Sequence, residues 1–390
     1  MDVGAVAGWL EERRDAFADA LRELVSIDSG TPSTDGVNAV ADALQRRFRE
    51  GGWEIDRRRP GGERPLGDIL VATIAGSGSH RVLLVCHMDT VFPDGTAAAR
   101  PFRVGDGRGY GPGVSDAKSG LLAGIDAVAA LRATGQDAFG PVTFVCNPDE
   151  EVGSPSSRPV IREVAAASDA AFVLEAGREN GDIVAARKGV TTVRVELAGR
   201  AAHAGVEPHR GRNAVLDGAL KTVDLQALNG TVDGLTVNVG VFSGGTRVNV
   251  VPDSCSLEVD VRAWDDDTLS AARDRILEIV SAPRVEGVEA TVHADNENAA
   301  MPRRESTERL VRLANDIAGE LGFSVPGAET GGVSDANVVA GVGTPVLDGL
   351  GPVGGDDHGP AEWVDLATAP NRIALLAGLI ARSGEAASHD

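Results

Sequence analysis

The sequence is short of cysteine, lysine and long apolar runs. Its three cysteines, Cys86, Cys146 and Cys255, form no C-x-x-C pair. Two of them lie inside apolar runs typical of strands, so we interpret them as reduced thiols in a protein core. Cys86 precedes His87, but neighbours in a strand point to opposite faces, which argues against a thiol nucleophile activated by that imidazole.

No apolar run reaches the roughly 20 residues that a membrane-spanning helix needs. The first residues mix acids with arginines at helical spacing. They lack the basic start and apolar centre of a secretory signal. We therefore expect a cytoplasmic protein without a membrane partner.

Positive charge is scarce as well. The net charge is −21, from 58 acidic and 37 basic residues. Lysine occurs only as Lys118, Lys188 and Lys221. Such a chain repels the phosphates of nucleic acid, so we expect no nucleic-acid partner. The same excess of acids is consistent with a site that requires cations.

The first half of the chain alternates between strand and helix patterns. A chain of 390 residues is long enough for two domains. The alternation predicts an α/β domain whose mostly parallel sheet has helices on both faces. The expected helices are 5–26, 37–51, 117–133 (capped by Ser115) and 155–167, and the expected strands are 53–58, 68–75, 81–86, 141–146 and 170–174.

From about residue 189 the order changes to βαββαβ, the pattern of a ferredoxin-like unit. We expect strands 190–198, 235–242, 255–263 and 288–293, with helices 211–228 and 267–281. Helices return at 305–322, 334–340 and 366–382, with a strand near 345–348. This order predicts a discontinuous catalytic, metal-binding domain (1–188 and 297–390) interrupted by an inserted domain (189–296).

Acidic and imidazole side chains follow several expected strands of the first domain. Individually they could be ordinary solvated loop acids. Together they would place much negative charge in one crevice, which is unfavourable without a cation. Imidazole with carboxylate suits Zn²⁺ best, with Mn²⁺ or Co²⁺ as substitutes. The set comprises His87, Asp89, Asp116, Glu150, Glu151, Glu175 and His358.

Glu150 and Glu151 are neighbours, and neighbours diverge in extended backbone. One carboxylate could therefore bind metal while the other faces substrate as a general base.

These residues stand in ordered motifs. The chain resembles the dinuclear-zinc family that contains carboxypeptidase G, aminoacylase, acetylornithine deacetylase and succinyl-diaminopimelate desuccinylase, from about residue 20 to its end. The motifs are HMDTV (87–91), GPGVSDAKSG (111–120), NPDEEVGS (147–154), LEAG (174–177), GRAAHAG (199–205) and DDHGPAEW (356–363). HMDTVF, DEE-x-GS and ETGGVSDA (329–336) are most similar to the carboxypeptidase G branch.

The resemblance implies two metal ions bridged by Asp116. One ion would also take His87 and Glu175, and the other Glu151 and His358. Asp89 would orient His87. Glu150 would take a proton from the bridging water and later pass it to the leaving nitrogen.

The resemblance also implies a homodimer formed through the inserted domain, which would act as a lid. His203 would enter the active site of a partner subunit and stabilise the oxyanion. Asn249 and Arg262 match positions that help to hold substrate.

One position departs from the family pattern. Carboxypeptidase members carry an arginine just after the inserted domain, in a G-x-R-P string, that pairs with the substrate's terminal carboxylate. Here the aligned string is 296–300. Asn298 lacks the charged guanidinium with which an arginine binds both oxygens of a carboxylate. Arg303 and Arg304 stand nearby as candidate substitutes. The departure leaves hydrolysis intact but weakens the case for terminal-glutamate specificity.

We therefore predict a zinc-dependent metallopeptidase or amidohydrolase that cleaves an amide bond next to a carboxylate-bearing amino acid. One alternative is an N-acyl amino acid deacylase of the aminoacylase or acetylornithine deacetylase type. Another is a metal-binding scaffold without catalysis. Glu150 and His203 disfavour the scaffold, because neither is needed merely to hold zinc.

Overall fold

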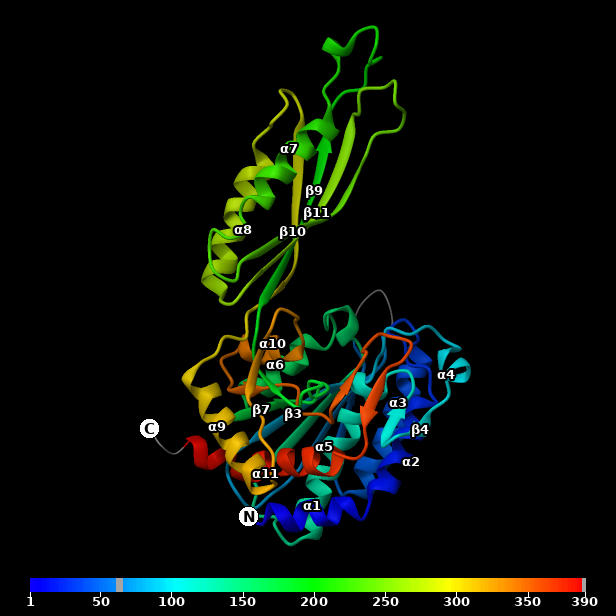
Figure 1. Ribbon diagram of the computed structural model, residues 1–390, viewed down its shortest axis with the longest axis vertical. Coiled ribbons are helices and arrows are strands. Elements are labelled where there is room, and N and C mark those ends of the chain that lie inside the picture. Colours follow the sequence, from blue (N-terminus) through cyan, green and yellow to red (C-terminus); the bar gives the residue numbers. More distant parts are fainter. Residues whose placement is uncertain (61–65, 388–390) are drawn as a thin grey trace. The chain divides into compact units, whose positions relative to one another are not determined.

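The computed structural model describes residues 1–60 and 66–387, with side chains for all of these except 295–297, 386 and 387 (Figure 1). The chain divides into two compact units. Unit 1 comprises Met1–Ala185, Arg303–Glu329 and Ser334–Asp390, and unit 2 comprises Ala186–Pro302 and Thr330–Val333. The catalytic role predicted for the first and the lid role predicted for the second stay predictions.

Unit 1 is built on a six-stranded sheet of order β1-β2-β6-β3-β7-β14. The neighbouring pairs among β6, β3, β7 and β14 are parallel, whereas β2 is antiparallel to both β1 and β6. The strands are β1 (Glu54–Arg58), β2 (Ile69–Ile74), β3 (Val82–His87), β6 (Val142–Asn147), β7 (Ala170–Val173) and β14 (Val346–Leu347). The sheet is therefore mostly parallel, and β3 lies at its centre.

Side chains alternate along β3, so they are buried on both faces of the sheet. Leu84 and Cys86 belong to the main apolar cluster, whereas Leu83 and Val85 are buried on the opposite face. The cluster face is covered by α3 (Thr34–Glu50) and α5 (Ser119–Ala133), backed by α1 (Val3–Glu11), α2 (Arg14–Val25), α9 (Glu305–Glu320) and α11 (Ala369–Ala387). The other face is covered by α6 (Arg158–Ala166) and α10 (Asp335–Ala340). Helices thus cover both faces, as predicted.

The single helix expected over 5–26 is wrong, because the chain forms α1 and α2 with a bend between them. The amide of Arg13 donates to the carbonyl of Leu10 at 3.0 Å, a tighter i to i+3 bond that ends α1. Both helices still bury apolar residues, Val6 in α1 and Leu21 in α2 among them. The apolar spacing therefore continues through the bend, and the sequence pattern does not reveal where the first helix ends.

Two further sheets have no counterpart in the sequence prediction. One has the order β15-β16-β5-β4, and the other pairs β13 with β8. Their strands are β4 (Arg103–Gly105), β5 (Arg108–Tyr110), β15 (Gly354–Gly355), β16 (Trp363–Asp365), β8 (Ile183–Arg187) and β13 (Gly327–Thr330), and a short helix, α4 (Thr96–Ala99), precedes β4. Tyr110 is the register partner of Trp363, so this sheet holds the loop after β5 beside the segment before β16.

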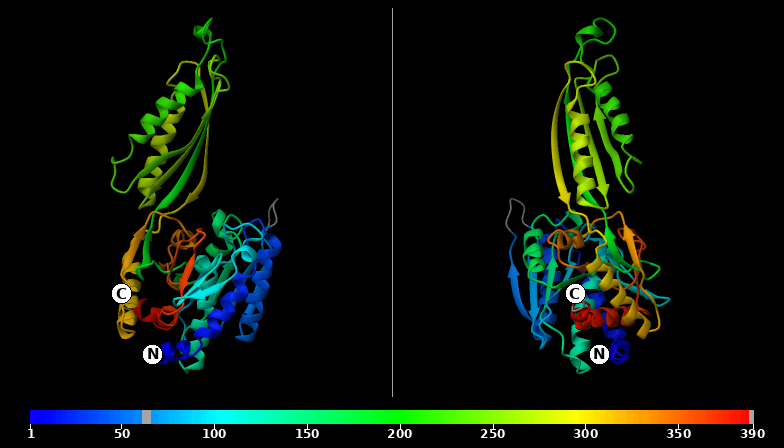
Figure 2. Two further views of the ribbon diagram at one scale, coloured as in Figure 1. Left: turned by 45° about the vertical axis from the view of Figure 1, so that its right-hand side comes forward. Right: turned by 90° about the vertical axis from the view of Figure 1, so that its left-hand side faces the viewer.

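Unit 2 is a four-stranded antiparallel sheet of order β10-β11-β9-β12. Figure 2 shows both of its helices on one side of this sheet. The elements are β9 (Gly189–Ala198), α7 (Ala214–Gln226), β10 (Thr236–Gly244), β11 (Ser254–Ala263), α8 (Asp266–Ser281) and β12 (Glu289–Asn298). This is the βαββαβ ferredoxin-like arrangement, and the predicted fold class is confirmed.

A buried ion pair lies inside unit 2. The ammonium of Lys221 donates to Asp217, four residues earlier on α7, and both side chains are shielded from water. The other oxygen of Asp217 accepts from the amides of Arg284 at 2.6 Å and Val285 at 2.7 Å. The pair therefore ties α7 to the loop after α8.

Across the described part of the chain, we find no helix with both the length and the apolar character that a membrane crossing requires.

Candidate metal centre

His87 is the last residue of β3, and its two ring nitrogens have different partners. Nδ1 lies 3.0 Å from the backbone oxygen of Asp89, so an Nδ1–H donates to that carbonyl. Nε2 lies 2.9 Å from Oδ1 of Asp116 and 3.6 Å from Oε2 of Glu175. The carbonyl thus fixes the ring and turns Nε2 towards the carboxylates, the usual arrangement for a metal-binding histidine.

Asp116 lies between two imidazoles. While Oδ1 faces His87, Oδ2 lies 3.1 Å from Nε2 of His358. The same nitrogen of His358 lies 3.2 Å from Oε2 of Glu151. Candidate ligand atoms of His87, Asp116 and Glu151 all lie within 4.8 Å of one another. The structure therefore brings all five predicted metal ligands together around Asp116.

The pKa values of these groups depend on burial and on their mutual contacts. Burial raises the pKa of Glu151 and of Glu175 to about 7. Burial alone would also raise the pKa of Asp116, but hydrogen bonds from His358 and His87 outweigh it and hold the pKa below its ordinary value. The hydrogen bond to Asp116 raises the pKa of His358 to about 9.

The donor set fits a bound metal ion. It combines two imidazoles with three carboxylates, the ligand types that zinc takes in proteins. Oε1 of Glu151 is buried and has no hydrogen-bond partner within the described residues. A buried carboxylate oxygen without a donor is costly, and a cation would satisfy it.

Asp89 contributes more than the predicted contact with His87. Its carboxylate lies 3.4 Å from Nδ1 of His87, further away than its backbone oxygen. It also accepts from the hydroxyl of Thr31 at 2.7 Å and from the amides of Glu150 at 3.1 Å and Glu151 at 3.3 Å. Asp89 therefore links the imidazole to the turn that carries both glutamates.

Extended backbone at Glu150 and Glu151, as the sequence analysis expects, is wrong. Glu150–Val152 forms a 3₁₀ turn, because Asp89 accepts both of the amides that begin it. The two carboxylates nevertheless have different surroundings. Glu151 faces His358, whereas the Glu150 carboxylate makes no hydrogen bond or ion pair to any other residue of the described part. Burial and the charge of Glu175 hold the pKa of Glu150 well above its ordinary value.

Glu362 is a residue of the site that the sequence analysis misses. Its buried carboxylate accepts from the amides of Gly113, Ser115 and Asp116. Burial raises its pKa to about 7. The motif DDHGPAEW contains it, but the resemblance assigns a role only to His358 there. The predicted Ser115 cap is also wrong, because α5 begins at Ser119 and the Ser115 amide is directed to Glu362 instead.

Asp335 is a second residue that the sequence analysis misses, and it contacts the residues that flank the Glu150 turn. Its carboxylate accepts from the side-chain amide of Asn147 at 2.7 Å and from the hydroxyl of Ser154. Asn147 ends β6 and Ser154 follows the turn, so Asp335 joins the two ends of the segment that carries both glutamates. Burial raises the pKa of Asp335 to about 6.

The remaining candidates lie in unit 2, at two places. The amide of Ala204 donates to the backbone oxygen of Asn249 at 3.0 Å, which brings the exposed loops of His203 and Asn249 together. Arg262 stands at the far end of β11, where its guanidinium binds both oxygens of Asp260 at 2.9 and 3.0 Å. The structure therefore separates Arg262 from the other two.

Asn298, which stands where carboxypeptidase members have the arginine, is the last residue of β12. Asn298 is 9% exposed, and the side chains of Asn296 and Glu297 lie outside the described residues. Of the two nearby arginines, Arg303 is engaged with Glu308 and with the carbonyl of Gly327.

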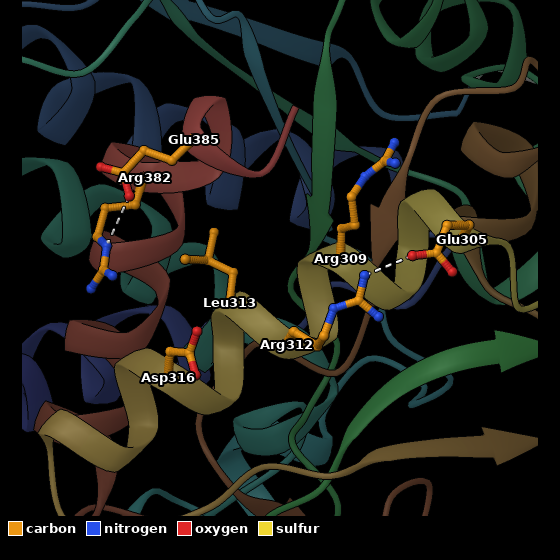
Figure 3. Close-up of a pocket in the computed structure, with 7 residues that line it drawn as sticks. All are labelled: Glu305, Arg309, Arg312, Leu313, Asp316, Arg382 and Glu385. Atoms are coloured by element: carbon orange, nitrogen blue, oxygen red, sulfur yellow. Dashed lines mark hydrogen bonds and ion pairs between the residues drawn. The ribbon is translucent and has the colours of Figure 1, made fainter. Parts of the chain in front are cut away.

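A surface depression of about 430 Å³ lies between α9 and α11 (Figure 3). Arg312 there binds Glu305 at 2.7 Å, and Arg382 lies 3.6 Å from Glu385. These are exposed ion pairs of the kind that contribute little to stability. The depression contains none of the predicted site residues, so we assign no function to it.

Residues 83–382 match the peptidase family M20/M25/M40. Carboxypeptidase G2 from Pseudomonas sp. (strain RS-16) is 31% identical over 374 residues, which cover 95% of this chain and 89% of that protein. Acetylornithine deacetylase from Myxococcus xanthus is 31% identical over 263 residues, which cover 63% of this chain and 67% of that protein.

Solved structures agree on the fold. Aminopeptidase PepT from Bacillus cereus ATCC 10987 matches with a TM-score of 0.83 at 24% identity, covering 95% of this chain and 99% of that one. A tripeptidase from Staphylococcus aureus subsp. aureus Mu50 matches with a TM-score of 0.80 at 23% identity, with the same coverage. The resemblance drawn from the motifs is confirmed, and the chain belongs to peptidase family M20/M25/M40, a family of metal-dependent hydrolases.

Proposed function

We propose that the chain is a dinuclear zinc amidohydrolase that cleaves an amide bond next to a carboxylate-bearing amino acid. The observation that carries the proposal is the convergence of His87, Glu151, Glu175 and His358 on Asp116, with Glu150 half-buried beside them and free of any partner in the described chain. The relationship to carboxypeptidase G2 along 95% of the chain supports the substrate class.

Two zinc ions would be held by five side chains, with manganese or cobalt as substitutes. Asp116 would bind both ions, His87 and Glu175 one of them, and Glu151 and His358 the other. When bound, such ions polarise the substrate carbonyl and lower the pKa of water. Protein purified without chelator should contain close to two ions per chain by elemental analysis. A chain free of metal after zinc reconstitution would contradict the assignment.

Glu150 is the proposed proton carrier. It would accept a proton from the attacking water and deliver it to the leaving nitrogen. Its environment supports the role, because burial and Glu175 raise its pKa and so favour the protonated form that the second step needs. Asp89 would hold both His87 and the Glu150 turn in place, through the contacts described above.

An N-acyl amino acid deacylase is the second candidate, and a relative supports it. Its substrates also carry a carboxylate beside the amide, so Asn298 does not separate the two candidates. The acetylornithine deacetylase from M. xanthus is also 31% identical in its matched region.

A release assay distinguishes the two candidates. It would compare dipeptides with varied C-terminal residues, N-acyl amino acids and folate-type amides, each with zinc, manganese or cobalt supplied. Preference for a C-terminal glutamate or aspartate supports the first candidate, and preference for short acyl groups supports the second. No turnover of any amide would contradict both.

We further propose that two chains associate through unit 2. β10 is an edge strand, which leaves a row of backbone groups unpaired. Phe242 on this strand is 43% exposed, and on the adjacent helix α7 Leu216 and Val223 are 49% and 67% exposed. The two helix residues are seven apart and so share a face. An apolar patch beside an open strand is typical of a surface that pairs with a second copy.

In such a dimer His203 would serve the partner's active site, where it would stabilise the oxyanion. Gly189 and Ala198 are the two ends of β9. A strand of ten residues is about 30 Å long, so the loop of His203 begins far from the point where the chain enters unit 2. Asn249 on the adjacent loop would contact substrate from the same side. To contact substrate, Arg262 would first have to break its ion pair with Asp260.

Subunit exchange tests this arrangement. His203→Ala and Glu150→Gln chains are each expected to be nearly inactive. If His203 acts across the dimer, mixing them creates dimers with one intact site, and activity returns. If His203 serves its own chain, every site keeps one defect and the mixture stays inactive. A fully active monomer by sedimentation would also contradict the proposal.

A further inference from the structure

The buried carboxylate of Glu362 lies behind the loop that carries Asp116. Its Oε2 accepts from the amide of Gly113 at 2.8 Å, and its Oε1 accepts from the amides of Ser115 at 2.9 Å and Asp116 at 3.1 Å. The Glu362 residue is 1% exposed, so water does not compete for these bonds. Three amides of one short stretch therefore converge on a single carboxylate.

This stretch satisfies only some of its own amides: that of Val114 donates to the carbonyl of Gly111 at 3.3 Å, and that of Lys118 donates to the carbonyl of Gly113 at 3.0 Å. Asp116 and the next residue, Ala117, have non-helical dihedral angles, with φ/ψ of −112°/91° and −129°/31°. A segment of this shape cannot use the regular hydrogen bonds of a helix, and buried amides without acceptors are costly. Glu362 supplies the acceptors, and so the loop shape depends on it.

The segment that carries Glu362 also carries His358. His358 contacts the Asp116 carboxylate at 3.1 Å, while Glu362 binds the Asp116 amide. The amide of Gly111 donates to the backbone oxygen of Glu362 at 3.4 Å, which adds a further link between the segments. One short segment therefore holds both the side chain and the backbone of the residue at the middle of the site.

We propose that Glu362 is a positioning residue of the metal centre, which holds the backbone of Asp116 so that its two carboxylate oxygens face His87 and His358. It binds neither the ions nor the substrate. A carboxylate is required because two oxygens without a donor match three N–H groups, whereas a glutamine would turn its own NH₂ towards one of them. This inference rests on the proposed metal site.

The test is zinc binding by the full-length metal-free chain, titrated with Zn²⁺ alone. Glu362→Gln should weaken zinc affinity by about 10–100-fold, the usual effect of losing a group that orients a ligand. Its thermal midpoint without metal should fall, because one buried amide loses its acceptor, so the titration is made at a temperature at which the variant is folded. With Co²⁺ in place of zinc, the visible absorption spectrum should change, because that spectrum reports the ligand geometry at Asp116.

Asp365→Asn is the matched control. Asp365 lies three residues further on, and its Oδ1 accepts from the amides of Ala367 at 2.8 Å and Thr368 at 3.1 Å. It thus also binds backbone amides, but in a segment without metal ligands. Its variant should keep wild-type zinc affinity and the wild-type cobalt spectrum. An equal loss of zinc affinity in Asp365→Asn would overturn the proposal.

Wild-type zinc affinity in Glu362→Gln would also overturn it. If the wild-type chain itself binds no zinc, the proposed metal site is contradicted and this inference with it. If the wild type binds zinc and Glu362→Gln binds it equally well, only this inference is contradicted. Should Glu362→Gln not fold, amide hydrogen exchange in the metal-free wild type decides. Slow exchange at Ser115 and Asp116 supports the proposal, and exchange as fast as in an exposed loop overturns it.

Discussion

The two units of the chain treat their buried carboxylates differently. In unit 2 the buried carboxylate of Asp217 is neutralised by Lys221 from its own helix. In unit 1 the buried cations Lys118 and Arg372 donate to backbone carbonyls rather than to acids. The buried acids of unit 1, within the described residues, are Asp89, Asp149, Asp335, Asp348 and Glu362.

The acids of unit 1 fall into two groups. Those just named accept hydrogen bonds from amides and side-chain donors, as Asp149 does from the amide and hydroxyl of Ser156. The candidate ligands Asp116, Glu151 and Glu175 instead face imidazoles and one another. This difference sets the candidate ligands apart from the other acids of unit 1 and supports the metal site proposed for them.

The largest expected effect separates two neighbouring acids of unit 1. Glu150→Gln should lower turnover by about 10²–10⁴-fold and leave metal content unchanged, because the group moves protons and does not bind metal. Glu151→Gln should instead lower metal affinity, because its carboxylate faces His358. Steady-state kinetics with elemental analysis on both variants checks this. Near-wild-type turnover in Glu150→Gln would mean that the proton carrier is another group.

The next effect concerns the internal pair of unit 2. Lys221→Met should destabilise this unit by about 3–5 kcal/mol, because Asp217 is left as a buried charge without a cation. Arg275→Met, which breaks the exposed pair with Glu278 on α8, should cost no more than about 1 kcal/mol. Hydrogen exchange on peptides from unit 2 measures both. Equal losses of stability in the two variants would show that the buried pair contributes no more to stability than the exposed pair does.

Metal removal should act on unit 1 alone. Zinc at 100 to 1,000 times its dissociation constant stabilises a protein by about 3–4 kcal/mol, and chelation removes that contribution. We expect faster amide exchange around β3 and the Glu150 turn after chelation, and unchanged exchange around Asp217. A matched loss of protection in unit 2 would contradict the assignment of the metal to unit 1.

The main elements could be predicted from the sequence because their signals are local. The run Val82–Cys86 is a buried strand ending at His87, and the order of patterns after residue 189 yields the ferredoxin-like unit. The pool of acidic and imidazole candidates could be named because most of them follow strands of one sheet, whose carboxyl ends meet at one edge, whereas the choice of five ligands among them came from the family resemblance. Asp116 and His358 lie in loops, and the resemblance, not a local pattern, assigned them to the metal ions.

What the sequence could not reveal depends on contacts between distant segments. Glu362 binds amides about 250 residues earlier in the chain, and no local pattern marks such a bond. The sheet that holds these segments together consists of strands of two or three residues, too short for a periodic signal. The 3₁₀ turn at Glu150 likewise follows from Asp89, 61 residues away.

The smallest predicted effect tests whether unit 1 holds an uncompensated acid away from the metal centre. Asp126 lies on α5 and lines a cavity of about 10 Å³ together with Arg13, Arg14 and Phe17. Burial raises its pKa from 3.8 to about 6, although the charge of Arg47 opposes the shift. The folded chain therefore holds this proton more tightly than the unfolded chain does.

The sign of the pH dependence follows from that difference. Between about pH 4 and pH 6 the folded chain binds more protons at Asp126, so its contribution to stability falls as the pH rises and is fully unfavourable above pH 6. Asp126→Asn removes the charge, and at pH 7.5 it should stabilise unit 1 by about 2–3 kcal/mol. That gain should fade as the pH approaches 4. Urea unfolding at several pH values measures it, with Asp19→Asn on the exposed surface of α2 as the control that should change little. A gain that is independent of pH would show that the carboxylate charge is not the cause, and a loss at pH 7.5 would show that the charged form is stabilised in the fold.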